Sequence, residues 1–274
     1  METQAQLEEV LTTEPLVAGL LLGSVLLTLV CAGGLLALML YLRSRQRLHF
    51  NQVLPLHLPL WEQAVIYGGL ALLFFTIQSG ADATWARILQ LASAPLAILA
   101  VALAPRGLSQ HYGLEKVSPL LLPALALLVL MAGFAIIFPA NLISNLVLQG
   151  FGVETGLQDP VQRFLETDDP DRLMGMLFVG VIFAPIMEEV LFRGLLQPML
   201  KAALGLWPAV LLTSLIFAAI HFHLPAFTAL FVLAVIMSLA YEYTGSVMVC
   251  ILIHMFFNAY QLGFMLLLRA YLPA

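Results

Sequence analysis

The stretch LVAGLLLGSVLLTLVCAGGLLALMLYL, residues 16–42, contains no charged side chain. A helix needs about 20 apolar residues to cross the hydrocarbon core of a bilayer, so this stretch is long enough to span it. Backbone N–H and C=O groups in lipid must be hydrogen-bonded within the segment, which favours a helix. We therefore expect the fold to include a transmembrane helix at this position.

The whole chain has the composition of a membrane protein. It is 62% hydrophobic and 10% charged, with a mean hydropathy of +1.00, whereas a soluble domain is about 25% charged. The charge-free run from Ala202 to Tyr241 is too long for one helix, and Pro225 is the expected break because proline cannot continue the hydrogen-bond ladder. Pro139 is expected to end the fourth span in the same way and to leave 140–150 as a short interfacial helix. The prediction is an all-α polytopic membrane helical bundle of about eight spans: 16–42, 59–79, 88–105, 117–138, 174–201, 206–222, 225–242 and 246–268.

Polar segments divide the chain into four parts. A polar N-terminal tail, 1–15, precedes a four-span membrane region, 16–150, and an acidic connector, 151–172, separates it from a second four-span region, 173–274. Cytoplasmic loops carry more Lys and Arg than external ones. The basic residues after the first span, between the third and fourth spans and at the end of the fifth share one side, so both termini and the connector are expected outside. The expected location is the plasma membrane of a prokaryote.

Three charges in the run APIMEEVLFRG, residues 184–194, are out of place in such a chain. Ionisable groups at membrane depth are costly and usually functional. Glu189 and Arg193 are four residues apart on one helical face, which suits an ion pair. Glu188 is rotated by about 100° from Glu189, and the residue four positions after it is Phe192. Glu188 is therefore the carboxylate that an ion pair does not explain.

The last three spans add further polar groups to the same half of the chain. His221 follows Phe217 by four residues, and Asn258 follows His254 by four, so each pair shares a helical face. With a rise of about 1.5 Å per residue from the turn before the sixth span, Glu188 and these polar residues fall in a band about 12 Å high. Four side chains from three helices can therefore converge.

Structural roles compete with a functional one for each residue taken alone. A structural ion pair is the leading interpretation of Glu189 and Arg193, and His221 alone fits a satisfied buried histidine. His254 and Asn258 can be hydrogen-bonding contacts between helices. The structural interpretations weaken when combined, because each residue would need a separate reason to lie in the same half.

The residue types fit the hydrolysis of a carbonyl compound, most simply a peptide bond. A carboxylate and an imidazole in a low-dielectric cavity can take a proton from water, and amide and imidazole donors can stabilise an oxyanion. Pro185 is expected to bend the helix and tilt Glu188 toward the cavity. A zinc hydrolase would favour HExxH, which does not occur, so no cofactor is expected and zinc at a dispersed Glu/His site is a lesser alternative. An ion-coupled transporter would show a matching polar set in the first half, which is not seen.

Three short motifs occur in order along the second half. EEVLFR (188–193) matches EExxxR, FAAIH (217–221) matches FxxxH, and HMFFN (254–258) matches HxxxN. In this order and spacing they resemble the CPBP (Abi) family of intramembrane glutamate proteases, which includes the type II CAAX prenyl endopeptidases. The similarity covers about 174–265, the last four spans.

The resemblance implies an intramembrane endopeptidase that cleaves a membrane-associated or lipidated protein or peptide, as in CAAX-box protein processing. The expected surroundings are the lipid bilayer, and no nucleic-acid partner is expected. A non-catalytic membrane scaffold or a bacteriocin-immunity protein is the alternative, and an ion-coupled transporter is a lesser one. By resemblance, Glu188 and His221 would activate the water, His254 and Asn258 would form the oxyanion hole, and Glu189 and Arg193 would orient the site.

Overall fold

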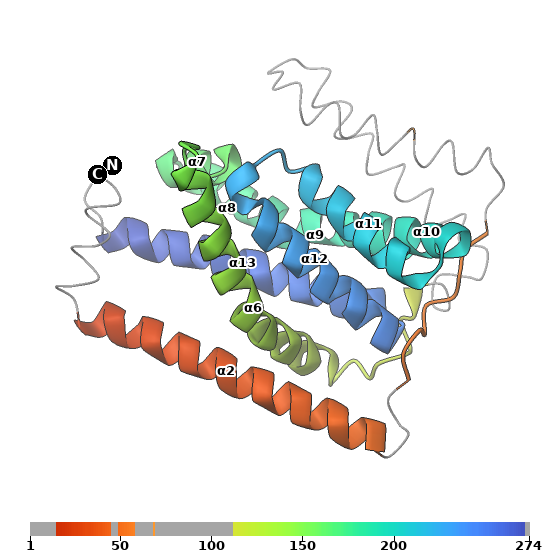
Figure 1. Cartoon of the computed structure of the whole chain (residues 1–274). Helices are drawn as coiled ribbons and strands as arrows, with labels where there is room; N and C mark the ends of the chain where they lie inside the picture. The colour runs from red at the N-terminus through yellow and green to blue at the C-terminus, as the bar shows by residue number, and fades with distance from the viewer. Residues whose placement is uncertain (1–14, 45–48, 58–67, 69–111, 272–274) are drawn as a thin grey trace.

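The computed structural model describes residues 15–44, 49–57, 68 and 112–271 (Figure 1). The regular elements in these ranges are all helical, which confirms the predicted fold class. In chain order they are α2 (Pro15–Ser44), α6 (Leu122–Gly150), α7 (Asp159–Glu166), α8 (Pro170–Phe178), η1 (Val179–Phe183), α9 (Ala184–Leu191), η2 (Phe192–Leu196), α10 (Gln197–Leu204), α11 (Leu206–Ala219), α12 (Leu224–Thr244) and α13 (Val247–Tyr271).

Five helices in the described ranges are long and apolar enough to cross a bilayer: α2, α6, the helix Pro170–Leu204, α12 and α13. Large apolar side chains such as Val30, Ile143 and Trp207 are exposed on the outside of the bundle, where lipid rather than water suits them. The chain is an integral membrane protein with a helical bundle. The predicted spans 59–79 and 88–105 lie outside the described residues, so the count of eight stays a prediction.

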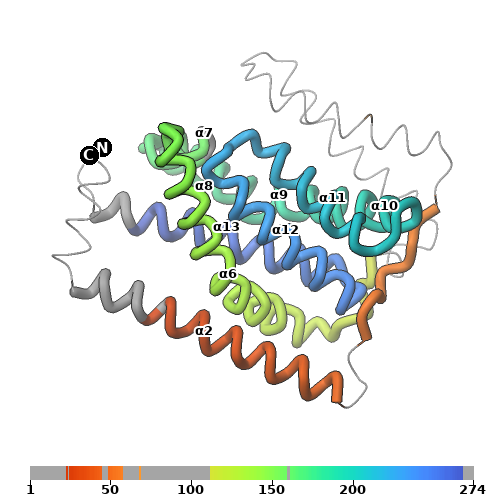
Figure 2. The backbone as a smooth tube through the Cα atoms, viewed as in Figure 1, coloured from red at the N-terminus to blue at the C-terminus, as the bar shows by residue number. Residues whose placement is uncertain are grey.

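The helices pack around a centre formed by α6, α12 and α13, which contact one another in pairs (Figures 1 and 2). The helix Pro170–Leu204 packs on α13 through its first half and on α11 through its last turns, and α11 packs on α12. α2 lies against α6 on the outside of the bundle. The fully buried side chains of Ile137, Leu233 and Ile253 mark the core between the central helices.

Helix α6 corrects the prediction made from Pro139. The helix does not end at this proline but continues to Gly150, so 140–150 is not a separate interfacial helix. One proline removes a single backbone donor, and transmembrane helices tolerate this where neighbouring helices hold the segment. Here the Thr228 hydroxyl of α12 donates to the Ser144 hydroxyl at 2.8 Å and attaches the second half of α6 to the bundle.

The helix Pro170–Leu204, which carries the two glutamates, changes its hydrogen-bond pattern twice. The π segments η1 and η2 lie on either side of α9. In such a segment each N–H bonds five residues back instead of four, and single π turns occur frequently at functional sites. A widened turn lies immediately before Pro185 within one helix, and the bend predicted at this proline stays a prediction.

The turns between the last helices contain glycines with positive φ and a short helix cap. Gly205 (φ 84°) ends α10 and Gly245 (φ 64°) ends α12, a position where a residue without Cβ is favoured. The ring of His223 accepts a hydrogen bond from the Ala226 amide and caps the first turn of α12. These turns place α11, α12 and α13 next to one another (Figure 2).

The acidic connector 151–172 is partly helical. It contains α7 and the first residues of α8, whose N-terminal amides at Asp171 and Arg172 donate to the Asp169 carboxylate. Phe164 is buried and α7 contacts α13. The connector therefore packs against the bundle at the end opposite to the turns at Gly205 and Gly245 (Figure 1).

Candidate active site

The two adjacent glutamates of α9 have different surroundings. Glu189 is fully buried, whereas 27% of the Glu188 side chain is exposed. Adjacent residues point about 100° apart on a helix, so one carboxylate faces the packed interior and the other the open side. This difference supports the separation of the two residues predicted from their spacing.

Glu189 holds both a cation and an imidazole. Its Oε1 accepts a hydrogen bond from Arg193 Nη1 at 2.8 Å, which confirms the predicted ion pair. The same oxygen lies 2.9 Å from His254 Nδ1 on α13. A carboxylate oxygen only accepts, so His254 carries its proton on Nδ1 and donates it to Glu189.

The other nitrogen of His254 faces Glu188. Nε2 lies 3.9 Å from Glu188 Oε2, and that oxygen is buried and makes no hydrogen bond to the described residues. Because Glu189 fixes the orientation of the ring, Nε2 is held toward the free carboxylate. Glu188 and His254 therefore face each other across a gap of 3.9 Å.

His221 lies in the turn that follows α11. Its Nδ1 is 2.8 Å from the carbonyl oxygen of Phe217, one helical turn earlier. A carbonyl oxygen accepts, so Nδ1 donates, and Nε2 of the neutral ring keeps a lone pair. Phe222, the next residue, has φ 47°, an uncommon conformation for a non-glycine residue that directs the chain into α12.

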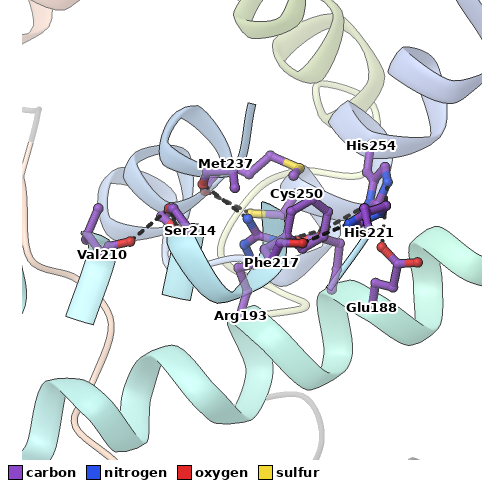
Figure 3. A network of polar contacts seen from close by, with 12 residues as sticks. Glu188, Arg193, Val210, Ser214, Phe217, His221, Met237, Cys250 and His254 are labelled. Carbon is purple, nitrogen blue, oxygen red and sulfur yellow. Dashed lines mark hydrogen bonds and ion pairs between the residues drawn. The ribbon is translucent and has the colours of Figure 1, made fainter. Parts of the chain in front are cut away.

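Phe217 joins these residues. It is fully buried, and its ring centre lies 5.1 Å from that of His221 and 5.6 Å from that of His254. The guanidinium of Arg193 lies 4.8 Å from the same ring centre, a cation–π distance. Figure 3 shows Glu188, His221 and His254 gathered beside Phe217. The aromatic ring therefore fixes the spacing of the two imidazoles without contributing a polar group.

Asn258 is placed by a backbone carbonyl of η1. Its Nδ2 donates to Gly180 O at 2.8 Å. Within η1 the Ala184 amide bonds to Val179 O, five residues back, and the next donor in that pattern would be the amide of residue 185. Residue 185 is proline, which has no N–H, so Gly180 O is free to accept from Asn258. Pro185 thus acts on the site by leaving the carbonyl oxygen of Gly180 without a backbone donor.

The structure brings the six predicted residues into one region by three routes. One network contains Glu188, Glu189, Arg193 and His254. His221 is connected to it through the ring of Phe217. Asn258 lies one turn beyond His254 and binds the helix that carries Glu188. Asn258 Nδ2 has a second N–H beyond the one given to Gly180. Among the described residues no group of three or more His, Cys, Asp or Glu side chains is arranged to hold a metal ion.

The roles of Phe217 and Gly180 could not be predicted from the sequence. The aromatic position in FAAIH suggested only a shared helical face with His221. The position of Gly180, five residues before Pro185, is a usable indication once a π turn is suspected, because the missing N–H then falls opposite that carbonyl.

The region that carries these residues is similar to a known family. Residues 170–260 match the family model described as "Type II CAAX prenyl endopeptidase Rce1-like". No curated protein and no solved structure matches the chain. The matched range begins with α8 and extends just beyond Asn258, so it includes the whole network described above. The similarity of residues 170–260 to this Rce1-like family agrees with the resemblance that the three motifs indicated.

Proposed function

We propose that this protein is an intramembrane endopeptidase that hydrolyses a peptide bond of a membrane-associated or lipidated protein. The observation that carries the proposal is the 3.9 Å gap between Glu188 Oε2 and His254 Nε2, with the far side of His254 held by Glu189. Ionisable groups in membrane-spanning helices are costly, and a hydrolytic site accounts for Glu188, the carboxylate that the Glu189–Arg193 ion pair leaves over. The family match of residues 170–260 supports the same reaction class.

In the proposed reaction Glu188 is the general base. A water molecule between its carboxylate and Nε2 of His221 loses a proton to Glu188 as its oxygen attacks the scissile carbonyl carbon. The lone pair on His221 Nε2, left by the Nδ1 bond to Phe217 O, orients the second hydrogen of that water. Collapse of the tetrahedral intermediate breaks the C–N bond, and the proton held by Glu188 passes to the leaving amine.

The oxyanion is stabilised by His254 and Asn258 in this proposal. The bond from Nδ1 to Glu189 holds the ring of His254 in place, and Nε2 is the donor to the oxyanion when it carries a proton. Asn258 supplies the N–H that Gly180 does not use. Donors fixed before the reaction are worth more in a water-poor site than in bulk water. Each donor group is held by a second hydrogen bond, so neither has to be ordered during catalysis.

The proposed reaction uses no metal. The nitrogen of His254 nearest to Glu189 is committed to that carboxylate, and Glu188 is the one carboxylate that remains directed at the second nitrogen. A strong chelator is therefore expected to leave cleavage unchanged. Loss of cleavage with a chelator, restored by added zinc, would replace this mechanism with the zinc alternative.

The surroundings of the site suit a lipid-attached substrate. Met174, Phe178 and Ile182 are exposed apolar side chains on the same helix, on either side of Gly180. A lipid chain that approaches along this face would bring the adjoining peptide toward Glu188. We propose a prokaryotic plasma membrane as the location, with both termini outside, because the last turn of α2, which contains Arg43, lies at the opposite end from the acidic connector.

The test uses the purified full chain in lipid nanodiscs and an internally quenched peptide with a farnesylated cysteine followed by three residues. Glu188→Gln keeps the shape of the side chain and removes the base, so the cleavage rate should fall by about 10²–10⁴-fold. Glu154→Gln removes an exposed carboxylate of the connector and should leave the rate unchanged. Equal rates for wild type and Glu188→Gln would refute the proposed mechanism.

A second experiment identifies the natural substrate and tests the scaffold alternative. Membranes of cells with wild-type protein or Glu188→Gln are compared by proteomics, and a peptide that stays uncleaved only in the variant is expected. An unlipidated version of the quenched peptide shows whether the lipid chain is required. A biological effect that persists with Glu188→Gln would favour a scaffold or immunity role over catalysis.

A further inference from the structure

A line of buried polar side chains runs away from the candidate site along the same helix. Glu189, Arg193, Gln197 and Lys201 follow one another at intervals of four residues, and all four are buried. Long polar side chains are rarely buried without partners. The partners of the last three lie on the facing helix α12.

Helix α12 presents acceptors at the same interval of four residues. Arg193 Nη2 donates to Ala234 O at 3.1 Å. Gln197 Nε2 lies 3.4 Å from Ser238 O and 3.0 Å from Glu242 Oε1. Lys201 Nζ donates to Glu242 Oε2 at 2.6 Å, within a pair that is almost completely buried. We call this set of contacts between the two helices the polar ladder.

The π segment η2 keeps the ladder on one face. Residues four apart on an α-helix drift by about 40° at each step, because four residues exceed one turn of 3.6. Three steps from Glu189 to Lys201 would turn the last side chain about 120° away from the first. The wider turn of η2, between Phe192 and Leu196, slows this rotation. All of the ladder residues can then face α12.

The segment 49–57, which we call the strap, contacts the polar ladder at Lys201. Lys201 Nζ also donates to Val53 O at 2.6 Å. The amides of Gln52 and Leu56 donate to Glu242 O at 2.9 Å and to Pro198 O at 3.0 Å. Val53 and Leu56 are buried. The strap therefore covers the Lys201–Glu242 pair and binds the ends of both helices.

We infer that Lys201 and Glu242 are positioning residues, which fix the axial register of the glutamate-bearing helix against α12 and so the depth of Glu188 relative to His254. This inference rests on the proposed function. Apolar helix faces tolerate sliding, whereas a buried polar pair is satisfied in one register; specifying register is the best-attested role of such pairs. A slip of one turn moves a helix by about 5.4 Å, which would separate Lys201 from Glu242. Because α13 follows α12 through the turn at Gly245, the register also sets where His254 meets Glu188.

The decisive variant replaces both partners, Lys201→Met with Glu242→Met. Removing only one would leave a buried charge without its partner and destabilise the fold, whereas two apolar side chains of similar size keep the packing. Spin labels at Leu204 and Leu224, which are exposed at the end of α10 and the start of α12, report the axial offset by double electron–electron resonance. The label background lacks the two cysteines of the sequence, Cys31 and Cys250.

The expected result is a second distance population, displaced by about 5 Å, in the double variant and a single population in the unsubstituted background. With the farnesylated peptide, kcat of the double variant should fall at least tenfold with KM within twofold, because displacement of a catalytic group by an ångström or more lowers the rate strongly. Thr228→Val is the matched control, since it removes the hydrogen bond from α12 to Ser144 outside the ladder. It should lower the melting temperature and leave both the distance and kcat unchanged.

Three outcomes would overturn the inference. These are a single, unshifted distance in the double variant, an unchanged kcat despite a shifted distance, and the same shift in Thr228→Val. If the wild-type protein fails to cleave the peptide, the proposed function fails, and the distance measurement still decides whether the pair sets the register.

Discussion

Replacing Glu189 with glutamine tests the centre of the site without changing its shape. In the structure Oε1 of this buried carboxylate accepts from Arg193 Nη1 at 2.8 Å and from His254 Nδ1 at 2.9 Å. Glutamine keeps an oxygen that can accept one or both bonds, but it removes the charge that balances the guanidinium. The substitution therefore separates the electrostatic contribution of Glu189 from its packing.

The expected loss of stability follows from the burial of the pair. Both side chains have no exposed surface, and removing one partner of a buried ion pair costs about 3–5 kcal/mol because the other charge is left uncompensated. Arg193→Met should destabilise for the same reason. The double variant Glu189→Gln with Arg193→Met should cost less than the two single changes added together, since neither charge is then left alone.

The expected loss of activity follows from the hydrogen bond between Glu189 and His254. A comparable carboxylate-to-amide change beside a catalytic histidine lowers kcat by about 10⁴-fold. Since Glu189 also orients His254 here, we expect kcat to fall by about 10²–10⁴-fold in protein that is still folded. KM should stay within a few-fold, because Glu189 is buried away from the open side of the site.

The assay combines thermal unfolding of the variants in nanodiscs with cleavage of the farnesylated peptide at a temperature where each remains folded. Melting temperatures of the four proteins give the coupling between the two charges. A Glu189→Gln protein that is destabilised but cleaves at the wild-type rate would show that its bond to His254 has no part in the reaction. Strict additivity of the two single changes would refute the electrostatic account of the pair.

Two further substitutions address the segment around α9. Pro185→Ala restores a backbone N–H that competes with Asn258 for Gly180 O. The melting temperature should not fall, whereas kcat should fall about tenfold. An unchanged kcat would contradict the role given to the proline. At Gly194 an added Cβ would overlap the ring of Tyr112, so Gly194→Ala should cost about 1–3 kcal/mol of stability, measured as a lower melting temperature. Recovery of that loss by Tyr112→Leu in the same chain would confirm the steric cause.

The sequence allowed prediction of contacts within a helix better than contacts between helices. The four-residue spacing of Glu189 and Arg193 predicted the ion pair, which the structure confirms at 2.8 Å. The bond between Glu189 and His254 joins residues 65 positions apart. Helical periodicity gives the direction of each side chain on its own helix but not the rotation of one helix against another.

Lys201 shows a different reason for failure. The sequence assigned it to a basic cytoplasmic loop, because a lysine at the end of an apolar span is normally solvated. In the structure it lies in the last turn of α10, almost fully buried between Glu242 and the carbonyl of Val53. Its acidic partner is 41 residues later, and the strap that covers it belongs to a distant part of the chain. No local sequence pattern predicts the burial of Lys201, its pairing with Glu242 or its contact with the strap.

The two buried ion pairs of the domain leave Glu188 without a partner of opposite charge among its described residues. Between residues 173 and 268 the sequence has five charged side chains. Arg193 is paired with Glu189 and Lys201 with Glu242, both in buried ion pairs. A membrane interior disfavours unpaired charge, so these two pairs account for four of the five. Glu188 is the fifth, and its Oε2 lies 3.9 Å from Nε2 of His254. Glu188 is therefore the carboxylate of this range that the two buried ion pairs leave over. A carboxylate that lies beside an imidazole and belongs to neither ion pair is suited to taking a proton from water and returning it during hydrolysis.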